Sequence, residues 1–452
     1  LVTGLNNHNW PFTSRVFAET LEATGRFSVE ITEQPELSFA SADALRRVQL
    51  FVFDYNDLDQ PQAWDRMAKK NFVQAVKAGA GVVAIHAANN AFKGPPAWSE
   101  YEFMVGYMWR DGAGHGKFHE FDVETVDPEH PVTRGLPPIK AHPDELYHKM
   151  SNPQLTKPHL LMQAMSSKES GGTGRAEPVA WTLGFGKGRT FVTTLGHVWK
   201  GDQASKRSVL DPQFRVLLAR GAEWAATGEV TIPTTFNDVR RHNTLSDEER
   251  AAGWELLFDG TSPVGLRAFK GEAFPTKGWS VQDGELVHAA QGGGGDIVTR
   301  GEYADFEFTC DWKVAKGGNS GIMYRCDEKH NYPWETGREM QILDDEHHND
   351  GKKPKTRAGA MYDLFECGED VARPWGEWNT ARVVCRGPRI EHWLNGVRVV
   401  DVDVESDEYR EAYGASKFPS MKDFGTTASG HIALQDHGDE VRFRNIKVRR
   451  LK

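Results

Sequence analysis

The sequence predicts a multidomain protein in which an α/β domain is followed by an all-β sandwich. The chain has 452 residues, which is too many for one compact core. Its first half alternates short apolar runs with helical patterns. Everything after Trp254 consists of short alternating segments bounded by Gly, Pro, Asn and Asp. We therefore expect an α/β domain over 1–228, a linker with a short helix over 229–249, and a sandwich over 250–452.

The α/β domain is predicted from a strand–helix rhythm. Strands and helices are expected alternately at 1–5, 12–25, 49–55, 63–79 and 81–88. Further strands and a closing helix are expected at 119–126, 177–185, 189–196 and 214–228. Such a run predicts a mostly parallel sheet flanked by helices, with a ligand crevice beyond the carboxyl ends of the strands.

The linker and the sandwich have their own signals. Residues 229–244 lack both periodicities and contain Pro233. Ser246 and Glu249 have the spacing of a capping box, which starts a short helix. Asn395-Gly396, between two alternating segments, indicates a hairpin, because a type I′ turn needs two residues that tolerate positive φ. The number and spacing of the strands favour an antiparallel two-sheet sandwich.

Four cysteines bear on the compartment, and all lie in the sandwich. A hairpin centred on Gly318 would place Cys310 opposite Cys326, so a disulfide and a pair of buried thiols are both open. A disulfide would indicate an oxidising compartment. The first residues show no signal-peptide pattern. We weakly favour a periplasmic or secreted location, with any signal peptide already absent, and the compartment stays open.

Composition excludes several classes of function. With 39% hydrophobic and 26% charged residues, the chain is neither disordered nor rich enough in apolar stretches to span a bilayer. The net charge of -10 makes nucleic acid a poor partner, since binding to phosphates depends on Lys and Arg. Fourteen tryptophans suit sugar binding, although β-sheet cores use them equally.

Polar side chains follow several of the predicted strands in the first domain. His8 follows the first predicted strand, and the others end predicted strands, namely Asp54 in FVFD, His86 in GVVAIH and His197 in TFVTTLGH. Because the carboxyl ends of parallel strands meet at one edge of a sheet, we expect these side chains to converge. Loop residues would complete this second candidate site, namely His115, His119, Asp144, Glu145 and Tyr147. Such a cleft could orient a sugar or chelate a divalent cation, and for each histidine alone a structural role is the alternative.

Spaced motifs in this domain carry a family resemblance. They are GLNNHNW, AIHAANNAF, WSEYEFMVG, HGKFHEFDVETVDPEHPVTRGL, HPDELYHKM and PVAWTLGFGKGRTFVTTLGH. Residues 1–228 resemble the trehalose-utilisation, ThuA-like family, which implies a class I glutamine-amidotransferase-like fold and a role in carbohydrate metabolism. That fold places a nucleophilic Cys after a central strand, where this chain has His86. Since the domain has no Cys, thiolate attack on glutamine is unavailable to it.

The sandwich offers three strands with a polar face. Residues two apart share a face, which pairs Glu339 with Gln341, Asn319 with Arg325, and Gln435 with His437. One strand with a polar face usually belongs to a sheet surface exposed to solvent. Three such strands favour a concave binding face instead. The run 344–348 is read as a solvated loop, because five polar neighbours cannot all face one ion.

A second set of motifs covers the sandwich. It comprises GWELLFDG, WSVQDGELVH, GGNSGIMYR, EMQILDD, GAMYDLF, GEWNTARVVCRG, HWLNG and GHIALQDHGDEVRFRNIKV. Residues 250–452 resemble the 3-keto-disaccharide hydrolase family, which implies a concanavalin-like jelly-roll sandwich. The family is associated with cleaving glycosides whose glucose a separate enzyme has oxidised to a 3-ketone. Such a ketone acidifies the hydrogen on C2, so cleavage can proceed by elimination followed by addition of water, or by direct hydrolysis.

We carry these roles over as hypotheses. The expected catalytic residues are Glu339 as base or acid, His437 as second proton carrier and Arg325 as oxyanion stabiliser, while the expected substrate-binding residues are Gln341, Asn319, Tyr324 and Asp436. The leading interpretation is thus a hydrolase or lyase acting on 3-keto-glycosides. No cofactor is certain, and a divalent cation is the one candidate. The alternatives are a non-catalytic carbohydrate-binding protein, catalysis in the ThuA-like domain, and a two-carboxylate glycosidase for which Asp436 and Asp345 are weak second carboxylates.

Overall fold

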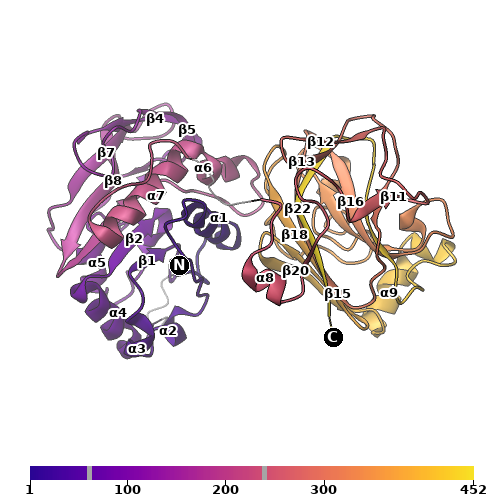
Figure 1. Ribbon diagram of the computed structural model, residues 1–452. Helices are drawn as coiled ribbons and strands as arrows, with labels where there is room; N and C mark the ends of the chain where they lie inside the picture. Colours follow the sequence, from indigo (N-terminus) through magenta and orange to yellow (C-terminus); the bar gives the residue numbers. More distant parts are fainter. Residues whose placement is uncertain (59–63, 237–241, 452) are drawn as a thin grey trace. The chain divides into compact units, whose positions relative to one another are not determined.

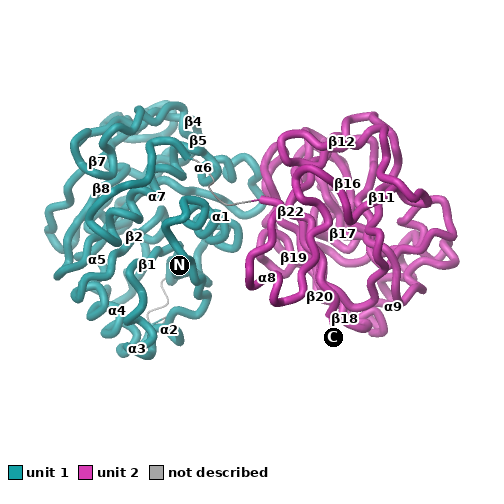
Figure 2. Tube along the Cα trace, viewed as in Figure 1, with its two compact units in different colours: residues 1–240 teal, residues 241–452 magenta. Residues whose placement is uncertain are grey.

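The computed structural model describes residues 1–58, 64–236 and 242–451 (Figure 1). The chain forms two compact units, residues 1–240 and 241–452 (Figure 2). The division falls within the segment 229–244 that the sequence indicates as a linker, although residues 237–241 of that segment lie outside the described part. Within the described ranges, no helix has the length and apolar character needed to span a bilayer.

The first unit is built on a seven-stranded sheet. Its strands, in spatial order, are β1 (Leu50–Phe53), β2 (Gly81–Ile85), β9 (Gly188–Thr193), β8 (Ala176–Phe185), β7 (His159–Met165), β4 (His119–Thr125) and β5 (Ile139–Asp144). Strands β1, β2 and β9 are parallel, and all other neighbours are antiparallel. The predicted α/β class is confirmed, but the sheet is mixed rather than mostly parallel. The turn between β8 and β9 is too short for a parallel crossover.

Helices cover both faces of this sheet. One face carries α1 (Trp10–Glu22), α6 (Arg207–Leu210) and α7 (Pro212–Thr227), and the other carries α2 (Pro35–Ser38), α3 (Ala42–Leu45), α4 (Arg66–Ala78) and α5 (Ser99–Val105) (Figure 1). Strand β2 shows why the sequence reads as continuously apolar there. Val83 and Ile85 join the core under α1 and α7, while Val82 and Ala84 join the core under α4 and α5. Both faces of a central strand are buried, so neither needs polar side chains.

Several short elements complete the first unit. They are η1 (His86–Asn90), β3 (Gly114–His115), β6 (Tyr147–His148) and η2 (Ala204–Lys206). The strand predicted over 1–5 is wrong in extent. Only Val2 forms bridges, to Phe53 and Thr32, because the residues after it turn away from the sheet toward α1.

The second unit is an all-β sandwich of two antiparallel sheets. The larger sheet contains β10 (Glu255–Leu256), β12 (Trp279–Gln282), β13 (Glu285–His288), β15 (Phe306–Val314), β18 (Asn379–Arg386), β19 (Arg389–Leu394), β20 (Val397–Asp403) and β22 (Val441–Arg450). The smaller sheet contains β11 (Leu266–Ala268), β14 (Ile297–Thr299), β16 (Asn319–Cys326), β17 (Arg338–Leu343) and β21 (His431–Leu434). The remaining elements are α8 (Asp247–Ala251), η3 (Pro333–Glu335), η4 (Asn349–Lys352), α9 (Asp407–Ala415) and η5 (Phe418–Ser420). The main core lies between the two sheets.

Two local predictions in this unit are confirmed. The Ser246 side chain accepts from the backbone N–H of Glu249, and the Glu249 carboxylate accepts from the backbone N–H of Ser246. Asn395 and Gly396, with φ of 49° and 79°, join the paired residues Leu394 and Val397.

The hairpin around Gly318 that a Cys310–Cys326 disulfide would need does not form. Strand β15 pairs with β18 and β22, whereas β16 pairs with β17 and β21, so the connection between β15 and β16 crosses from one sheet to the other. A short loop can join facing strands of a sandwich as well as neighbouring strands of a sheet, and sequence alternation is the same in both cases. Cys310 and Cys326 consequently lie in different sheets, and all four cysteines are free and buried.

Two candidate functional sites

The first candidate site is a cluster of three histidines and one glutamate at the edge of the first sheet. His86 follows β2 and His197 follows the neighbouring parallel strand β9, so these two come together for the reason the sequence predicted. His8 lies in the loop before α1, and Glu145 follows β5. All four residues are buried, and one ligand atom from each lies within 4.8 Å of the others. We call these four residues the histidine cluster.

Distances within the histidine cluster are short. Nε2 of His86 lies 3.3 Å from Nε2 of His8 and 3.3 Å from Nδ1 of His197. Oε1 of Glu145 lies 3.1 Å from Nδ1 of His197 and 3.7 Å from Nε2 of His86. The Tyr147 hydroxyl lies 2.8 Å from Nε2 of His86. Five polar groups therefore face one point in the protein interior.

His86 has an unusual backbone. Its φ is 47°, in the left-handed region that non-glycine residues rarely adopt, at the point where β2 turns into η1. The turn follows the carboxyl end of β2, and from it the His86 imidazole reaches His8 and His197. Strain of this kind is found where the surrounding structure over-determines one conformation.

Burial decides the charge states in the histidine cluster. It lowers the pKa of His86 to about 4 and that of His8 to about 2, and the neighbouring histidines lower both further. Burial opposes ionisation of Glu145, but hydrogen bonds from His115 and His197 hold its pKa well below the ordinary value. At neutral pH, His8 and His86 are therefore neutral beside an ionised carboxylate.

Other residues predicted for this site lie around the histidine cluster and hold its surroundings through hydrogen bonds. His115 Nδ1 lies 2.9 Å from Oε2 of Glu145, so it joins through the second carboxylate oxygen. The Asp144 carboxylate accepts from the backbone N–H groups of Gly196 and His197, which fixes the loop after β9. Asp54 accepts from Thr13, Ser14 and Asn6 and has no atom in the cluster.

His119 does not belong to the cluster, which corrects the prediction. It lies at the start of β4, and its Nδ1 donates to the Lys117 carbonyl.

Sequence reasoning also missed Trp199, whose ring stacks on His197 at an interplanar angle of 8° and meets His8 edge-on. Trp199 is 47% exposed, so an aromatic surface covers the cluster on its solvent side. In the sequence, the single sign that Trp199 belongs to this site is its position two residues after His197.

The second candidate site is a pocket of about 270 Å³ on the smaller sheet of the sandwich. Met340 and Ile342 of β17 enter the core between the sheets, so Glu339 and Gln341 point to the opposite, outer face. The parity predicted for this strand is thus found. We call this space the sandwich pocket, and its lining residues are Asn319, Trp334, Gly337, Glu339, Gln341, Tyr362, Lys417, Phe418, Gln435 and His437.

Glu339 lies directly over the neighbouring strand. A Cβ atom added to Gly321 would come within 2.0 Å of Oε1 of Glu339, so only glycine leaves room for this carboxyl group. Burial raises the pKa of Glu339 to about 7; Lys417 opposes this rise, while Asp296 and Asp350 add to it. Among the described residues, the Glu339 carboxyl has no hydrogen-bond or ion-pair partner. It is therefore free to exchange a proton near neutral pH.

Several amide atoms around Glu339 are also without partners in the described structure. Both polar atoms of the Gln341 amide, Oδ1 of Asn319 and Oε1 of Gln435 are buried and make no hydrogen bond. Buried polar atoms in folded proteins are almost always paired, so such a group of unpaired atoms around one pocket needs an explanation. A polar ligand in the sandwich pocket would supply the missing partners.

Three predicted residues are not part of the sandwich pocket. Tyr324 points into the core and its hydroxyl lies 2.9 Å from Nε2 of His392. Arg325 lies within a bulge of β16 and has φ of 53°, which turns its guanidinium toward the carbonyls of Ala304 and Gly387. Both placements correct our predictions. Regular alternation puts Tyr324 on the core face, whereas alternation fails for Arg325 at the bulge.

Asp436 is likewise engaged elsewhere. Its Oδ1 lies 3.0 Å from Nε2 of the buried His288, and its Oδ2 accepts from the backbone N–H of Gly295. His437 does line the pocket, 47% exposed at its side chain, with Nε2 3.5 Å from Nδ2 of Asn319. The loop over 344–348 is less solvated than predicted, since Asp344 is buried and accepts from the backbone N–H of Gly317.

Loop residues that the sequence did not indicate complete the sandwich pocket. Trp334 belongs to η3 and stacks on Tyr332 with an interplanar angle of 12°. Nζ of Lys417 lies 4.4 Å from the centre of the Tyr362 ring. These residues are remote from β17 in sequence, and no periodicity links a loop residue to a strand face. They contribute a flat aromatic surface and a cation to the space around Glu339.

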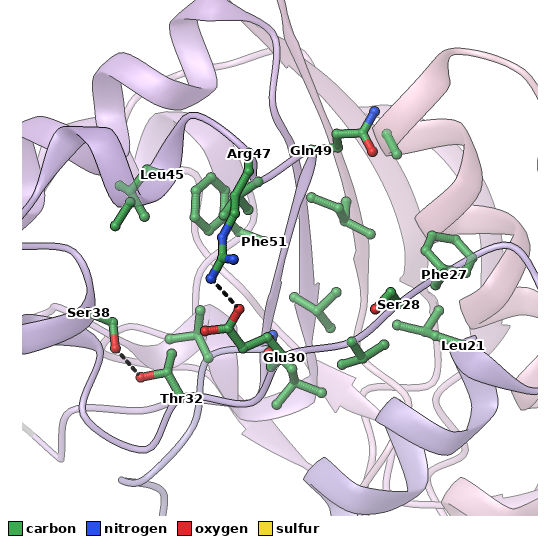
Figure 3. Close-up of a pocket in the computed structure, with 18 of the residues that line it drawn as sticks. Leu21, Phe27, Ser28, Glu30, Thr32, Ser38, Leu45, Arg47, Gln49 and Phe51 are labelled. Atoms are coloured by element: carbon green, nitrogen blue, oxygen red, sulfur yellow. Dashed lines mark hydrogen bonds and ion pairs between the residues drawn. The ribbon is translucent and has the colours of Figure 1, made fainter. Parts of the chain in front are cut away.

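A further pocket in the first unit has a different character. It has a volume of about 470 Å³ and is lined mainly by apolar side chains such as Leu21, Phe27 and Phe51 (Figure 3). Its polar residues pair with each other, as in the contact of Arg47 with Glu30 (Figure 3). It contains none of the predicted site residues.

The fold and the sites define a class of protein: an α/β unit with a histidine cluster, joined to a β-sandwich with a polar pocket around Glu339. Family models divide the chain in the same way. Residues 253–449 match the family described as 3-keto-alpha-glucoside-1,2-lyase-like domain, and residues 2–225 match the trehalose utilisation family, ThuA. A curated relative, the 3-keto-disaccharide hydrolase of Bacteroides thetaiotaomicron, is 31% identical over 229 residues, which are 44% of this chain and 79% of the relative. The chain belongs to the 3-keto-disaccharide hydrolase family, and its residues 2–225 match the ThuA family model.

Solved structures are similar to each kind of domain. A candidate glycosyl hydrolase from Parabacteroides distasonis is 33% identical, with 47% of this chain and 100% of that chain covered, and the TM-score is 0.44. A candidate ThuA-like protein from Parabacteroides merdae is 35% identical, with 51% of this chain and 90% of that chain covered, and the TM-score is also 0.44.

Proposed function

We propose that the protein cleaves 3-keto-glycosides in the sandwich pocket, with Glu339 as the proton-transferring base. The proposal is consistent with membership of the 3-keto-disaccharide hydrolase family, which supports a carbohydrate-cleaving enzyme. The observation that carries it is the Glu339 carboxyl group, unpaired among the described residues, with a pKa raised to about 7 in a pocket of sugar-binding size. A protein that only bound sugar would have no need of a titrating carboxylate there.

The proposed chemistry begins at C2 of the keto-sugar. Glu339 removes the proton on C2, and the electron pair of the C–H bond forms an enolate with the C3 ketone oxygen. The enolate then expels the aglycone oxygen from C1, which leaves a C1=C2 double bond conjugated with the ketone. The aglycone oxygen receives a proton and departs as an alcohol. Water adds across the double bond and returns a proton to C2, giving the free 3-keto-sugar.

Other groups in the sandwich pocket fit the remaining tasks. The Lys417 ammonium can stabilise the enolate oxygen, the role that we expected of Arg325, and the Gln341 amide N–H groups can donate to a sugar hydroxyl. His437, at the exposed rim, is positioned to protonate the aglycone. Asn319 and Gln435 have acceptor oxygens for sugar hydroxyls, and Trp334 offers an apolar face for the ring.

A product assay in deuterated water tests this function. The whole protein is given a 3-keto-glucoside and, separately, the unoxidised glucoside, and the products are followed by NMR. We expect cleavage of the keto form only, with deuterium at C2 of the released sugar. Cleavage of the keto form without deuterium would indicate direct hydrolysis. Cleavage of neither sugar would instead favour a carbohydrate-binding role and would contradict the proposal.

The substrate has a requirement of its own. A glycoside carries a hydroxyl at C3, so an oxidoreductase must remove two electrons and two protons from that carbon before Glu339 can act. We therefore expect this protein to work downstream of a sugar 3-oxidising enzyme.

A further inference from the structure

The histidine cluster of the first unit is not used by the proposed reaction, and its hydrogen bonds are unusual. Nδ1 of His86 lies 2.7 Å from the Thr194 carbonyl oxygen, which can only accept, so this nitrogen carries the proton. In a neutral ring, Nε2 of His86 then has a lone pair that points into the cluster and can accept from the Tyr147 hydroxyl, 2.8 Å away.

The tautomer of His8 is fixed in the same way. The Asn6 amide nitrogen donates to Oδ1 of Asp54, which sets the orientation of that amide. Its oxygen therefore faces Nδ1 of His8, at 3.1 Å, and accepts a proton from it. Nε2 of His8 is left with a lone pair, 3.3 Å from the lone pair of His86. Two lone pairs that face each other in a buried site repel unless a cation lies between them.

Four of the six distances between the ligand atoms have the size expected in a metal coordination shell, and all six lie within 4.8 Å. In a tetrahedral site with metal–nitrogen bonds of about 2.0–2.1 Å, neighbouring ligand atoms lie about 3.3–3.4 Å apart. His86 shows 3.3 Å to both His8 and His197, and Glu145 Oε1 shows 3.1 Å to His197 and 3.7 Å to His86. Direct hydrogen bonds between such groups would normally be shorter, near 2.9 Å.

We propose that His8, His86, His197 and Glu145 bind one first-row transition-metal ion, with zinc as the best match. Three imidazole nitrogens and one carboxylate oxygen form the kind of donor set that suits zinc, whereas Mg²⁺ and Ca²⁺ prefer oxygen ligands throughout. Glu145 binds through Oε1, and its Oε2 is held by His115. The outer hydrogen bonds from His86 to Thr194 and from His8 to Asn6 are those that orient metal-binding histidines in proteins.

Tyr147 gives the site a further feature. Its hydroxyl lies 2.8 Å from Nε2 of His86, on the side where the metal would sit. Once that lone pair is used by the metal, the hydroxyl must turn to another acceptor. A hydroxyl, carbonyl or water oxygen that approaches the ion as an added ligand would be such an acceptor.

Metal analysis of the full-length protein tests the proposal. The protein is stripped with a chelator, and Zn²⁺ or Co²⁺ is added while binding and the visible spectrum are followed. We expect about one ion per chain and the intense d–d bands of a tetrahedral Co²⁺ site. His86→Ala is expected to weaken binding by more than about 100-fold, and Asn6→Ala by about 10–100-fold, because it only frees the His8 ring.

Two further variants guard against misfolding and nonspecific binding. Glu145→Gln keeps the side-chain shape, and we expect it to bind metal more weakly while retaining the wild-type circular dichroism. His119→Ala removes a histidine of the same unit outside the cluster and is expected to bind as the wild type does. If the wild type bound no tighter than His86→Ala, or if its cobalt spectrum were the weak one of an octahedral site, the proposal would be overturned.

Discussion

The two sites of this protein differ in what their polar atoms face. In the histidine cluster they face each other, within 4.8 Å, so the remaining space suits a single ion. In the sandwich pocket the amides of Gln341, Asn319 and Gln435 face a space of about 270 Å³ and have unpaired atoms. The first site thus suits the single cation that we propose, and the second suits the extended polar substrate that we propose.

The carboxyl groups of the two sites show the same contrast. Hydrogen bonds from His115 and His197 keep Glu145 ionised, which suits a permanent metal ligand. Glu339 is raised to a pKa of about 7 because burial outweighs the attraction of Lys417. A carboxyl group that titrates near neutral pH suits repeated proton transfer. Neighbouring charges and hydrogen bonds, rather than residue type, thus distinguish the proposed metal ligand from the proposed base.

The largest effect is expected from Glu339→Gln. The amide cannot accept a proton from carbon, so kcat on a 3-keto-glucoside should fall by about 10²–10⁴-fold, the usual contribution of a general base. Steady-state kinetics measure this loss. Glu366→Gln, an exposed carboxylate outside the pocket, is the matched control and should leave kcat unchanged. Near-wild-type turnover by Glu339→Gln would contradict the role of Glu339 as a base and, with it, the proposed functional difference from Glu145.

The next largest effect is expected from Gly321→Ala. The new methyl group would come within 2.0 Å of Oε1 of Glu339 and would push the carboxyl group aside. A displacement of about 1 Å can cost about 10²-fold in rate, so we expect a loss of that size in kcat with normal circular dichroism. Gly414→Ala, where an added Cβ atom meets nothing within 4 Å, is the control. Equal activity of the two variants would show that the position of Glu339 is not critical.

Gln341→Met tests the unpaired amides. Loss of one hydrogen bond of about 0.5–1.5 kcal/mol to the sugar predicts a rise in KM of about 2–10-fold, with a smaller change in kcat. Kinetics over a range of substrate concentrations separate the two parameters. Gln282→Met replaces an exposed glutamine on β12 and should have no effect. An unchanged KM for Gln341→Met would mean that this amide does not contact substrate.

Lys417→Met should move the pH dependence of kcat/KM. The base works when ionised, so activity should rise with pH through the pKa of Glu339, near 7. The ammonium of Lys417 stabilises the carboxylate and lowers that pKa, so its removal should shift the rising limb to higher pH. Rate measurements from acid to alkaline pH test this. A shift to lower pH would contradict the assignment of Glu339 as the base.

Chelation should have the smallest effect on cleavage. Each site is built from residues of one unit alone, so removal of a metal from the histidine cluster should leave turnover of the 3-keto-glucoside unchanged. The measurement is the initial rate before and after treatment with a chelator, with metal content followed in parallel. A loss of turnover that Zn²⁺ restores would mean that both sites serve one reaction.

Much of the architecture was predictable from local patterns. The strand–helix rhythm of the first half, the alternation of the second half, the Asn395-Gly396 turn and the capping box at Ser246 each depend on residues close in sequence. The polar face of β17 was predictable for the same reason, because parity along one strand is a local property. His86 and His197 could be paired because both follow strands of a parallel set.

The errors share one cause, which is that distant segments decide the outcome. The bulge in β16 turns Arg325 away from the pocket, and the crossing between the sheets separates Cys310 from Cys326. Neither feature changes the alternation of the sequence. Lys417 and Trp334 reach Glu339 from loops that no periodicity connects to β17.

The sequence by itself determined the order of strands and helices, the two units and the identity of the groups available for chemistry. Those features follow from backbone preferences and from burial of apolar faces, which act over a few residues. Only the tertiary structure decided which groups meet, and hence that Glu145 stays ionised while Glu339 titrates near pH 7. A pKa depends on every charge and dipole within several ångströms, and those neighbours come from segments far apart in the chain.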